Sequence, residues 1–413
     1  MKISSQVNKL LKDHKKHDIY LDHAATTPMD PAVKAAMDPY FCDKFGNPSG
    51  FYEIGLRAHE ALEEARNKVA KILNCSSREI VFCGSGTESD NLAILGVARF
   101  KGKGHIITSS IEHHAVLETI ERLEKQGFDI TILPVDRDGF VNPKDLDDAI
   151  REDTILASIM YANNEIGVIE PIKELATVCR NKGVLFHTDA CQAGCSLDLD
   201  VKELGVDLMT INGSKIYGPK GVGCLYVKAG IRLEPIVYGG GQERGLRSGT
   251  ENVPGVIGFA KALTLCQDDK DKENKRLTQL RDKLIKGLIT KVPKCFLNGH
   301  AVKRLPNNVN ITILDVEGEA MGLFLNELGI YASTGSACTS KSLDPSHVIT
   351  ALGLPYEAAH GSMRFTLGHC TTPEDIDFVI EVMPKIVEIL RKISPLDLDS
   401  NEVQEGHGNL HYK

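Results

Sequence analysis

Residues 207–223 read DLMTINGSKIYGPKGVG, and this stretch decides the fold. An apolar run of strand length ends in Asn-Gly-Ser, Lys215 follows, and Gly218, Pro219 and Gly221 then set a turn. This order places the lysine at the carboxyl end of a strand, where open α/β sheets bind their ligands. A lysine in a loop is more often a plain surface residue, so the segment predicts a site only if other residues join it.

Strand-like runs alternate with helical patterns on both sides of this segment. Many of the runs are apolar throughout, which is typical of a sheet covered on both faces. We predict strands at Ile80–Cys83, His105–Thr108, Ile130–Val135, Ile155–Met160, Val184–Thr188, Asp207–Ile211 and Gly221–Val227. We predict helices over Arg57–Leu73, Thr87–Phe100 and Ile172–Asn181. The sequence therefore indicates an α/β domain with a mainly parallel sheet.

The region after this domain has a different pattern. Residues 268–286, DDKDKENKRLTQLRDKLIK, predict a long exposed helix that carries the chain out of the sheet domain. Strands at Asn308–Leu314, Ile330–Ser333 and Met363–Leu367 and helices at Glu319–Leu328 and Pro373–Ile393 follow, which indicates a smaller α+β domain. We expect an N-terminal arm over 1–19 on the side of the small domain, a large domain over 20–265, a small domain over 266–396 and a flexible tail over 397–413.

Composition excludes several classes of function. A formal charge of −8 and a pI near 6.0 argue against a nucleic-acid surface, which has to be basic. The longest apolar stretches are strand-sized, far short of the roughly 20 residues of a membrane span. The 11 cysteines form no framework and no zinc spacing, and Cys191 and Cys195 are read as packing residues. We therefore expect reduced thiols in a cytoplasmic protein without a metal site.

Two more segments add chemistry to Lys215. The GSGT run at 84–87 lies between a strand and a helix, so free N–H groups and the Thr87 hydroxyl form an anion site. Asp189 leaves an apolar strand, either as a helix cap or as the partner of a protonated pyridinium nitrogen. An anion site, a ring partner and an amine are the set that pyridoxal 5′-phosphate (PLP) requires. Each signal is weak alone, and together they predict a PLP site.

The sequence also resembles a known family. The segments FGNPSG, SGTESDN, EHHAV, NNEIG, HTDACQ, INGSKIYGPKG, GGGQERGLRSGT and GSACTS are similar to those of cysteine desulfurases of the IscS/NifS type. These enzymes belong to the class V aminotransferase group of PLP-dependent transferases of fold type I. The resemblance extends from Tyr20 to Asp399, nearly the whole chain. It implies the conversion of L-cysteine to L-alanine, with transfer of the sulfur to a cysteine of the enzyme.

The resemblance also implies a role for each matching residue. Lys215 is expected to bind PLP covalently and to act as acid and base at the substrate, and His113 to stack on the ring and move protons at the sulfur. His114 is expected to be structural. Arg364 is expected to bind the substrate carboxylate through its two parallel donors. Asp189 is expected at the ring nitrogen of the cofactor, and Gln192 and Asn164 near its 3-oxygen. Asn164 is also expected near the substrate carboxylate. The residues expected at the phosphate are Gly86, Thr87, Asn212 and Ser214. Thr250 is expected to reach the phosphate of a neighbouring subunit, which implies a homodimer.

Cys338 is the expected sulfur acceptor. It stands in ASTGSACTSKS, a run of small residues that cannot pack a core, so the setting favours an exposed and reactive thiol. The resemblance implies a persulfide on Cys338, a transient role as iron–sulfur ligand, and delivery of sulfur to an iron–sulfur scaffold or another acceptor protein.

Some positions depart from the family pattern. Ser214 replaces a common histidine before the lysine, Cys191 replaces a common threonine, and the residues after Asp399 do not resemble the partner-docking terminus of well-known members. Three other readings stay open: a selenocysteine lyase, a class V aminotransferase, and a scaffold without PLP that only relays persulfide. The combination of Lys215, Asp189 and His113 argues against the scaffold.

Overall fold

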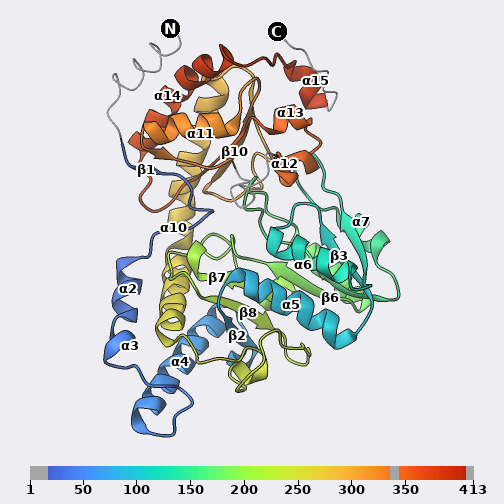
Figure 1. The fold of residues 1–413 in the computed structure, drawn as a ribbon, viewed down its shortest axis with the longest axis vertical. Coiled ribbons are helices and arrows are strands. Elements are labelled where there is room, and N and C mark those ends of the chain that lie inside the picture. The colour runs from blue at the N-terminus through green and yellow to red at the C-terminus, as the bar shows by residue number, and fades with distance from the viewer. Residues whose placement is uncertain (1–16, 335–343, 406–413) are drawn as a thin grey trace.

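The computed structural model describes residues 17–334 and 344–405. One region holds a seven-stranded sheet, and a second holds a three-stranded sheet. Figure 1 shows that the long helix α10 (Val253–Lys291) runs from the first region into the second. The boundary that we expect between residues 265 and 266 therefore falls inside a single continuous helix.

The large sheet has the strand order β2-β8-β7-β6-β5-β3-β4. Its strands are β2 (Ile80–Cys83), β3 (His105–Ser109), β4 (Asp129–Leu133), β5 (Thr154–Ser158), β6 (Leu185–Asp189), β7 (Leu208–Asn212) and β8 (Gly223–Val227). Strand β8 is antiparallel to both of its neighbours, and the pairs from β7 to β4 are all parallel. This confirms the predicted α/β fold with a mainly parallel sheet.

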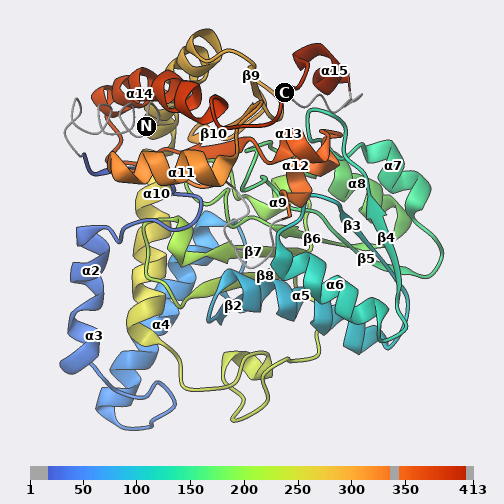
Figure 2. The same cartoon turned by 45° about the horizontal axis from the view of Figure 1, so that its top comes forward.

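Helices cover both faces of this sheet, as its apolar strands require. On one face, α4 (Glu53–Ile72), α8 (Ile172–Lys182) and the first part of α10 pack on a core that includes Phe186 and Phe259. On the other face, α5 (Gly86–Lys101) and α6 (His114–Glu124) lie side by side (Figure 2). The sheet therefore lies between two helical layers, and only its edge strand β4 is largely exposed or half-buried.

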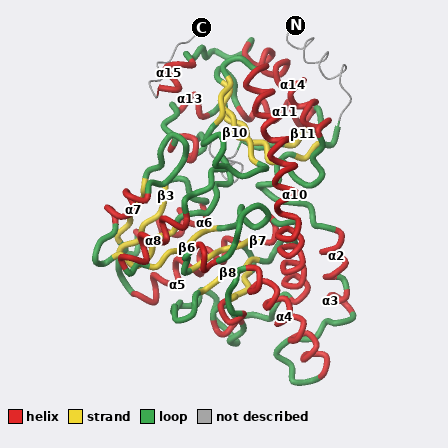
Figure 3. The backbone as a smooth tube through the Cα atoms, turned by 180° about the vertical axis from the view of Figure 1, so that it is seen from behind, coloured by secondary structure: helices red, strands yellow, loops and turns green. Residues whose placement is uncertain are grey.

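The second region is built on a small antiparallel sheet. Its strands β9 (Cys295–Leu297), β10 (Asn308–Ile313) and β12 (Ser362–Thr366) pack against α11 (Gly318–Glu327) and α14 (Pro373–Arg391). The N-terminal strand β1 (Ile19–Tyr20) pairs with β11 (Ile330–Tyr331), so the start of the described chain belongs to this region (Figure 3).

The prediction of an exposed helix over 268–286 is correct for the helix and wrong for one of its faces. Leu277, Leu280 and Leu284 are buried in the core of the second region. Most charges in this stretch lie on exposed or half-buried positions, with Arg281 buried, which is why the composition suggested exposure on all sides.

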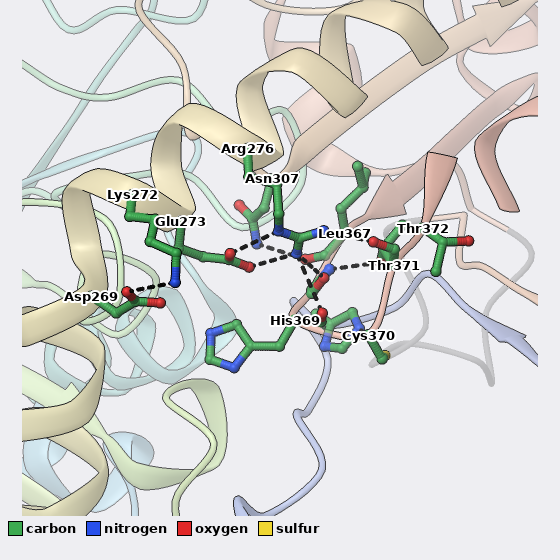
Figure 4. A network of polar contacts seen from close by, with 12 residues as sticks. Asp269, Lys272, Glu273, Arg276, Asn307, Leu367, His369, Cys370, Thr371 and Thr372 are labelled. Carbon is green, nitrogen blue, oxygen red and sulfur yellow. Dashed lines mark hydrogen bonds and ion pairs between the residues drawn. The ribbon is translucent and has the colours of Figure 1, made fainter. Parts of the chain in front are cut away.

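A polar network fastens α10 to the loop that follows β12 (Figure 4). Arg276 donates to the carbonyl oxygens of Thr371 at 2.7 Å and Gly368 at 2.9 Å, and its guanidinium also pairs with Glu273 at 2.6 Å. The helix that joins the two regions is thus tied to the chain segment that comes directly after the strand carrying Arg364.

The expected flexible tail over 397–413 is wrong for its described part. Residues 400–405 form α15 (Ser400–Glu405), and Leu398 and Val403 are buried against Leu314 and Ala358. These two apolar side chains anchor the segment to the second region, although the composition of the segment is mostly polar. Residues 406–413 lie outside the described residues.

The remaining elements are short. They are the α-helices α2 (Pro31–Met37), α3 (Pro39–Cys42), α7 (Pro143–Ala149), α9 (Val201–Leu204), α12 (His347–Ala351) and α13 (Tyr356–Ala359), and the 3₁₀ helices η1 (Ser77–Glu79), η2 (Gly213–Lys215) and η3 (Glu243–Gly245). Across the described ranges, none of the helices combines the length and the apolar character needed to traverse a bilayer.

Candidate active site

Several predicted site residues come from the ends of neighbouring strands. Asp189 is the last residue of β6, Asn212 is the last residue of β7, and Lys215 follows β7 in η2. Because β6 and β7 are parallel, their carboxyl ends lie at the same edge of the sheet. The sequence order alone thus brings a carboxylate, an amide and an amine together.

A cavity of about 260 Å³ opens at this edge. Nine residues that the sequence predicts for the site line it: Gly86, Thr87, His113, Asn164, Asp189, Gln192, Asn212, Lys215 and Arg364. Ala24, Ala25, Asp90, Met160, Ala162 and Cys191 complete the lining. The wall combines the beginnings of α5 and α6, the sheet edge and β12.

The amino end of α5 supplies the expected anion site. Ser85 caps the helix by accepting a hydrogen bond from the Glu88 amide, and Gly86 and Thr87 are the first helical residues. A Cβ on Gly86 would lie 2.7 Å from the Cys191 sulfur and 3.2 Å from the Asn212 Cβ, so only glycine fits here. The first turn of a helix leaves N–H groups without helical partners, and these favour a bound anion.

Lys215 and Gln192 both contact a segment for which the sequence predicted no role. Gln192 Nε2 donates to the Ala24 carbonyl at 3.0 Å, and the Lys215 ammonium donates to the Ala25 carbonyl. Both alanines belong to the YLDHAATTP segment near the amino end of the described chain. The only sequence signal for them was this segment's place in the family resemblance.

Asp189 and Asp90 place two buried carboxyl groups at the floor of the cavity. Asp189 Oδ1 accepts a hydrogen bond from the Cys191 amide at 2.8 Å. Burial, and then the nearby Asp189 charge, raise the pKa of Asp90 well above its ordinary value. We infer that Asp90 is protonated, since burial and a neighbouring carboxylate both disfavour its ionised form. No role was predicted for Asp90 from the sequence, although it stands inside the SGTESDN segment.

His113 is fixed by the helix that it begins. As the N-cap of α6 it accepts a hydrogen bond at Nδ1 from the Ala115 amide, at 3.0 Å. The neutral ring therefore carries its proton on Nε2. Burial lowers the pKa of His113, and the charge of Lys215 acts in the same direction, while Asp189 opposes it. The imidazole is thus held neutral beside the cavity.

Arg364 reaches the cavity from the second region. It is 3% exposed on β12, donates from Nη2 to Asp22 at 2.7 Å and from Nη1 to the Asn164 carbonyl at 3.0 Å. Its Nε is buried without a hydrogen-bond partner. A buried guanidinium with an unused donor that lines a cavity is suited to bind a carboxylate.

Two predicted residues, Ser214 and Thr250, are not among those that line this cavity. Ser214 is half-buried and is absent from its lining, although its amide bonds to the Asn212 side chain at 3.2 Å. Thr250 is exposed in the loop before α10. Cys338 lies outside the described residues. In the described ranges no cluster of three or more His, Cys, Asp or Glu side chains could hold a metal ion.

Comparisons with known proteins show the family of the chain. The family model for aminotransferase class V matches residues 19–379. The chain is 54% identical to a protein named cysteine desulfurase IscS from Methanosarcina thermophila, over 92% of this chain and 94% of that one. It is 52% identical to a protein of the same name from Dictyoglomus turgidum, over 92% and 97% of the two chains.

Solved structures show the same relationship. A NifS-like protein superposes with a TM-score of 0.85 at 36% identity, over 91% of this chain and 100% of that chain. The family match covers most of the chain, and the curated relatives are matched over nearly their whole length. The chain therefore belongs to the aminotransferase class V family, in its cysteine desulfurase branch.

Proposed function

We propose that this protein is a PLP-dependent cysteine desulfurase, which converts L-cysteine to L-alanine and transfers the sulfur to Cys338. The observation that carries the proposal is that Lys215, Asp189, His113 and Arg364 line one cavity. The names of the relatives that the chain matches over nine-tenths of its length support the same activity.

The residues present fit the cofactor. Lys215 would hold it covalently, Asp189 would pair with its ring nitrogen, and the first turn of α5 with Asn212 would bind its phosphate. Gln192 and Asn164 stand on the same wall for the 3-oxygen, and Ser214 would contribute from η2. When bound, PLP withdraws electrons from the α-carbon of an amino acid, which makes the loss of the α-proton easier.

The side chains of the protein would then bind the substrate and move its protons. The unpartnered Nε–H of Arg364 would hold the cysteine carboxylate, and the Lys215 amine would take and return the proton at the α-carbon. His113 presents Nε2–H, because Nδ1 is occupied by the Ala115 amide. It would therefore meet the substrate sulfur as a hydrogen-bond donor, and uptake of a second proton would require breaking the bond at Nδ1.

The described residues on either side of 335–343 support the role of Cys338. Ser333 pairs with Arg364 through backbone hydrogen bonds of 2.6 and 3.2 Å. Ser346 donates from its hydroxyl to Glu165 at 2.5 Å, next to Asn164, and His347 bonds to the Glu112 carbonyl at 3.0 Å. The described residues on either side of 335–343 thus contact Arg364 or the chain neighbours of Asn164 and His113.

Replacing Cys338 by serine tests the proposal. We expect the purified C338S protein to keep the absorbance of bound PLP and to lose sulfide release from L-cysteine in the presence of dithiothreitol. C370S, which removes an exposed cysteine of the described chain, is the matched control and should release sulfide normally. Normal sulfide release by C338S, or formation of a keto acid in place of alanine, would contradict the proposal.

We further propose a homodimer in which Thr250 contributes to the site of the partner. The exposed position of Thr250 leaves it available to a second chain, and the stretch 41–56 exposes Phe41, Phe45, Phe51, Tyr52, Ile54 and Leu56. So many exposed apolar side chains in one stretch favour a protein interface. Sedimentation equilibrium should give twice the chain mass, and T250A should hold PLP more weakly without dissociating the dimer.

Four finer assignments complete the proposal. We propose that the sulfur is delivered to an iron–sulfur scaffold or another acceptor protein, with Cys338 as transient cluster ligand, in the cytoplasm. We also propose the division into a large domain over 20–265 and a small domain over 266–396. A pull-down with labelled cysteine, followed by mass spectrometry, would identify the acceptor.

A further inference from the structure

Two cysteines from different elements of the large region contact each other next to the backbone of Lys215. Cys195 lies in the turn that follows β6, and Cys266 lies on α10. Their sulfur atoms are 2.7 Å apart, and both are reduced thiols. This approach is closer than packing alone requires, and it leaves no room for a third group between the sulfurs.

The pair also contacts the backbone that carries the lysine. The Cys195 thiol lies 3.7 Å from the Lys215 carbonyl oxygen, and the Cys266 thiol lies 3.4 Å from the Ile216 carbonyl oxygen. Both cysteines line a second, smaller cavity of about 30 Å³, to which Lys215 and Gln192 also contribute. A space of this size holds a water-sized molecule. A small polar reagent therefore has room beside the two sulfurs.

We propose that Cys195 and Cys266 form a reversible oxidation site, whose oxidant is a hydroperoxide and whose product is a disulfide joining the turn after β6 to α10. This inference does not depend on the proposed activity. It adds a modification site next to the backbone of Lys215, and it concerns sulfur atoms that the mechanism above does not use.

The reaction balances with hydrogen peroxide as the oxidant. One thiol sulfur attacks the O–O bond, which gives a sulfenic acid and one water molecule. The second thiol then displaces the sulfenic oxygen as a second water molecule, and the S–S bond forms. The two thiols lose two electrons and two protons, and the peroxide is reduced to water. Dithiothreitol reverses the reaction by thiol–disulfide exchange.

The hydrogen bond with Cys266 and burial both raise the pKa of Cys195 well above its ordinary value. The thiolate is the reactive form, so oxidation is expected to be slow at neutral pH and is best measured at mildly alkaline pH.

Peptide mapping of the full-length, cofactor-loaded protein tests the inference. The native protein is treated with hydrogen peroxide, its free thiols are alkylated after denaturation, and its peptides are mapped without reduction. We expect one peptide pair joined through Cys195 and Cys266, the loss of both of these thiols from the alkylated set, and recovery of both after dithiothreitol. If both cysteines stay alkylated, or if either is joined to another cysteine, the proposal is wrong.

Matched variants give a second measurement. C266S should lose the joined peptides, and its Cys195 should be trapped by dimedone as a sulfenic acid. C179S removes a buried cysteine on α8 that takes no part in the pair, so it should form the joined peptides as the unaltered chain does. Loss of the joined peptides in C179S as well would show that the pairing depends on general packing and would overturn the assignment.

Discussion

Arg364→Lys isolates the contribution of a guanidinium fork to substrate binding. Arginine offers five N–H donors, and Arg364 uses one for Asp22 and one for the Asn164 carbonyl. The buried Nε–H and a neighbouring Nη hydrogen remain for a carboxylate. Lysine keeps the charge but can supply at most one of the two parallel hydrogen bonds.

The magnitude follows from the hydrogen bond that is lost. A hydrogen bond between charged groups contributes about 1.5–3 kcal/mol, so we expect kcat/KM for L-cysteine to fall by about 10- to 150-fold. Steady-state alanine formation measures this ratio, and the absorbance of bound PLP should stay unchanged because Arg364 is not among its expected contacts. Most of the change should appear in KM if the carboxylate is bound equally in ground and transition states.

Arg391→Lys is the matched control. Arg391 is an arginine of the second region that donates to the carbonyl oxygens of Pro293 and Leu314, away from the cavity. It should leave kcat/KM within about twofold, since it changes no group near the site. If R364K and R391K gave the same small change, Arg364 would not be the carboxylate-binding residue.

Three further predictions concern buried ionisable side chains. Burial raises the pKa of Glu112 to about 8. Between its ordinary pKa and pH 8 the carboxyl is therefore protonated in the folded protein and ionised in the unfolded chain. Because the unfolded chain binds fewer protons in this range, the free energy of unfolding falls as the pH rises towards 8. Glu112→Gln should remove this decline, and its unfolding free energy relative to the unaltered chain should rise by about 3 kcal/mol between pH 5 and pH 8 in denaturant titrations. Asp90→Asn should shift the melting temperature little because Asp90 is inferred to be neutral, whereas Asp90→Leu should destabilise by about 1–3 kcal/mol because it removes the hydrogen bond with the buried Thr210 side chain, a ranking that calorimetry can check. Arg66→Met should cost about 3–5 kcal/mol because it leaves Glu243 buried without its bidentate partner at 2.7 and 2.8 Å, and the added change Glu243→Leu should recover part of the loss.

Local patterns predicted the large sheet well because its strands are apolar on both faces. Each of its predicted strands overlaps the observed one, with ends that differ by two residues or fewer. Strand β9 was missed because three residues give too short a pattern, and its existence depends on pairing with β10. The buried face of α10 and the burial of Val403 were hidden by surrounding charges, since composition does not record which face of a helix meets a partner.

For the candidate site as well, local sequence patterns could be predicted and contacts between distant segments could not. Residues at strand ends and helix starts, such as Asp189, Thr87 and Lys215, were predictable because the connection itself fixes their position. Asp22 and Ala25 were not, because they meet Arg364 and Lys215 only through contacts between distant parts of the chain. Thr250 was predicted from the family resemblance alone, and it is not among the residues that line the cavity of the single chain.

The position of the cavity between two regions explains why α10 has to be one continuous helix. Lys215 and Asp189 belong to the large region, Arg364 belongs to the small sheet, and Asp22 comes from the segment that joins strand β1 to the large region. Binding an amino acid through both its carboxylate and its amine requires these groups to keep a fixed separation. A straight helix that packs in both cores, held by Arg276 to the loop after β12, supplies that fixed separation. The same helix carries Cys266, so a disulfide to Cys195 would add a covalent link at the point where the large region holds Lys215.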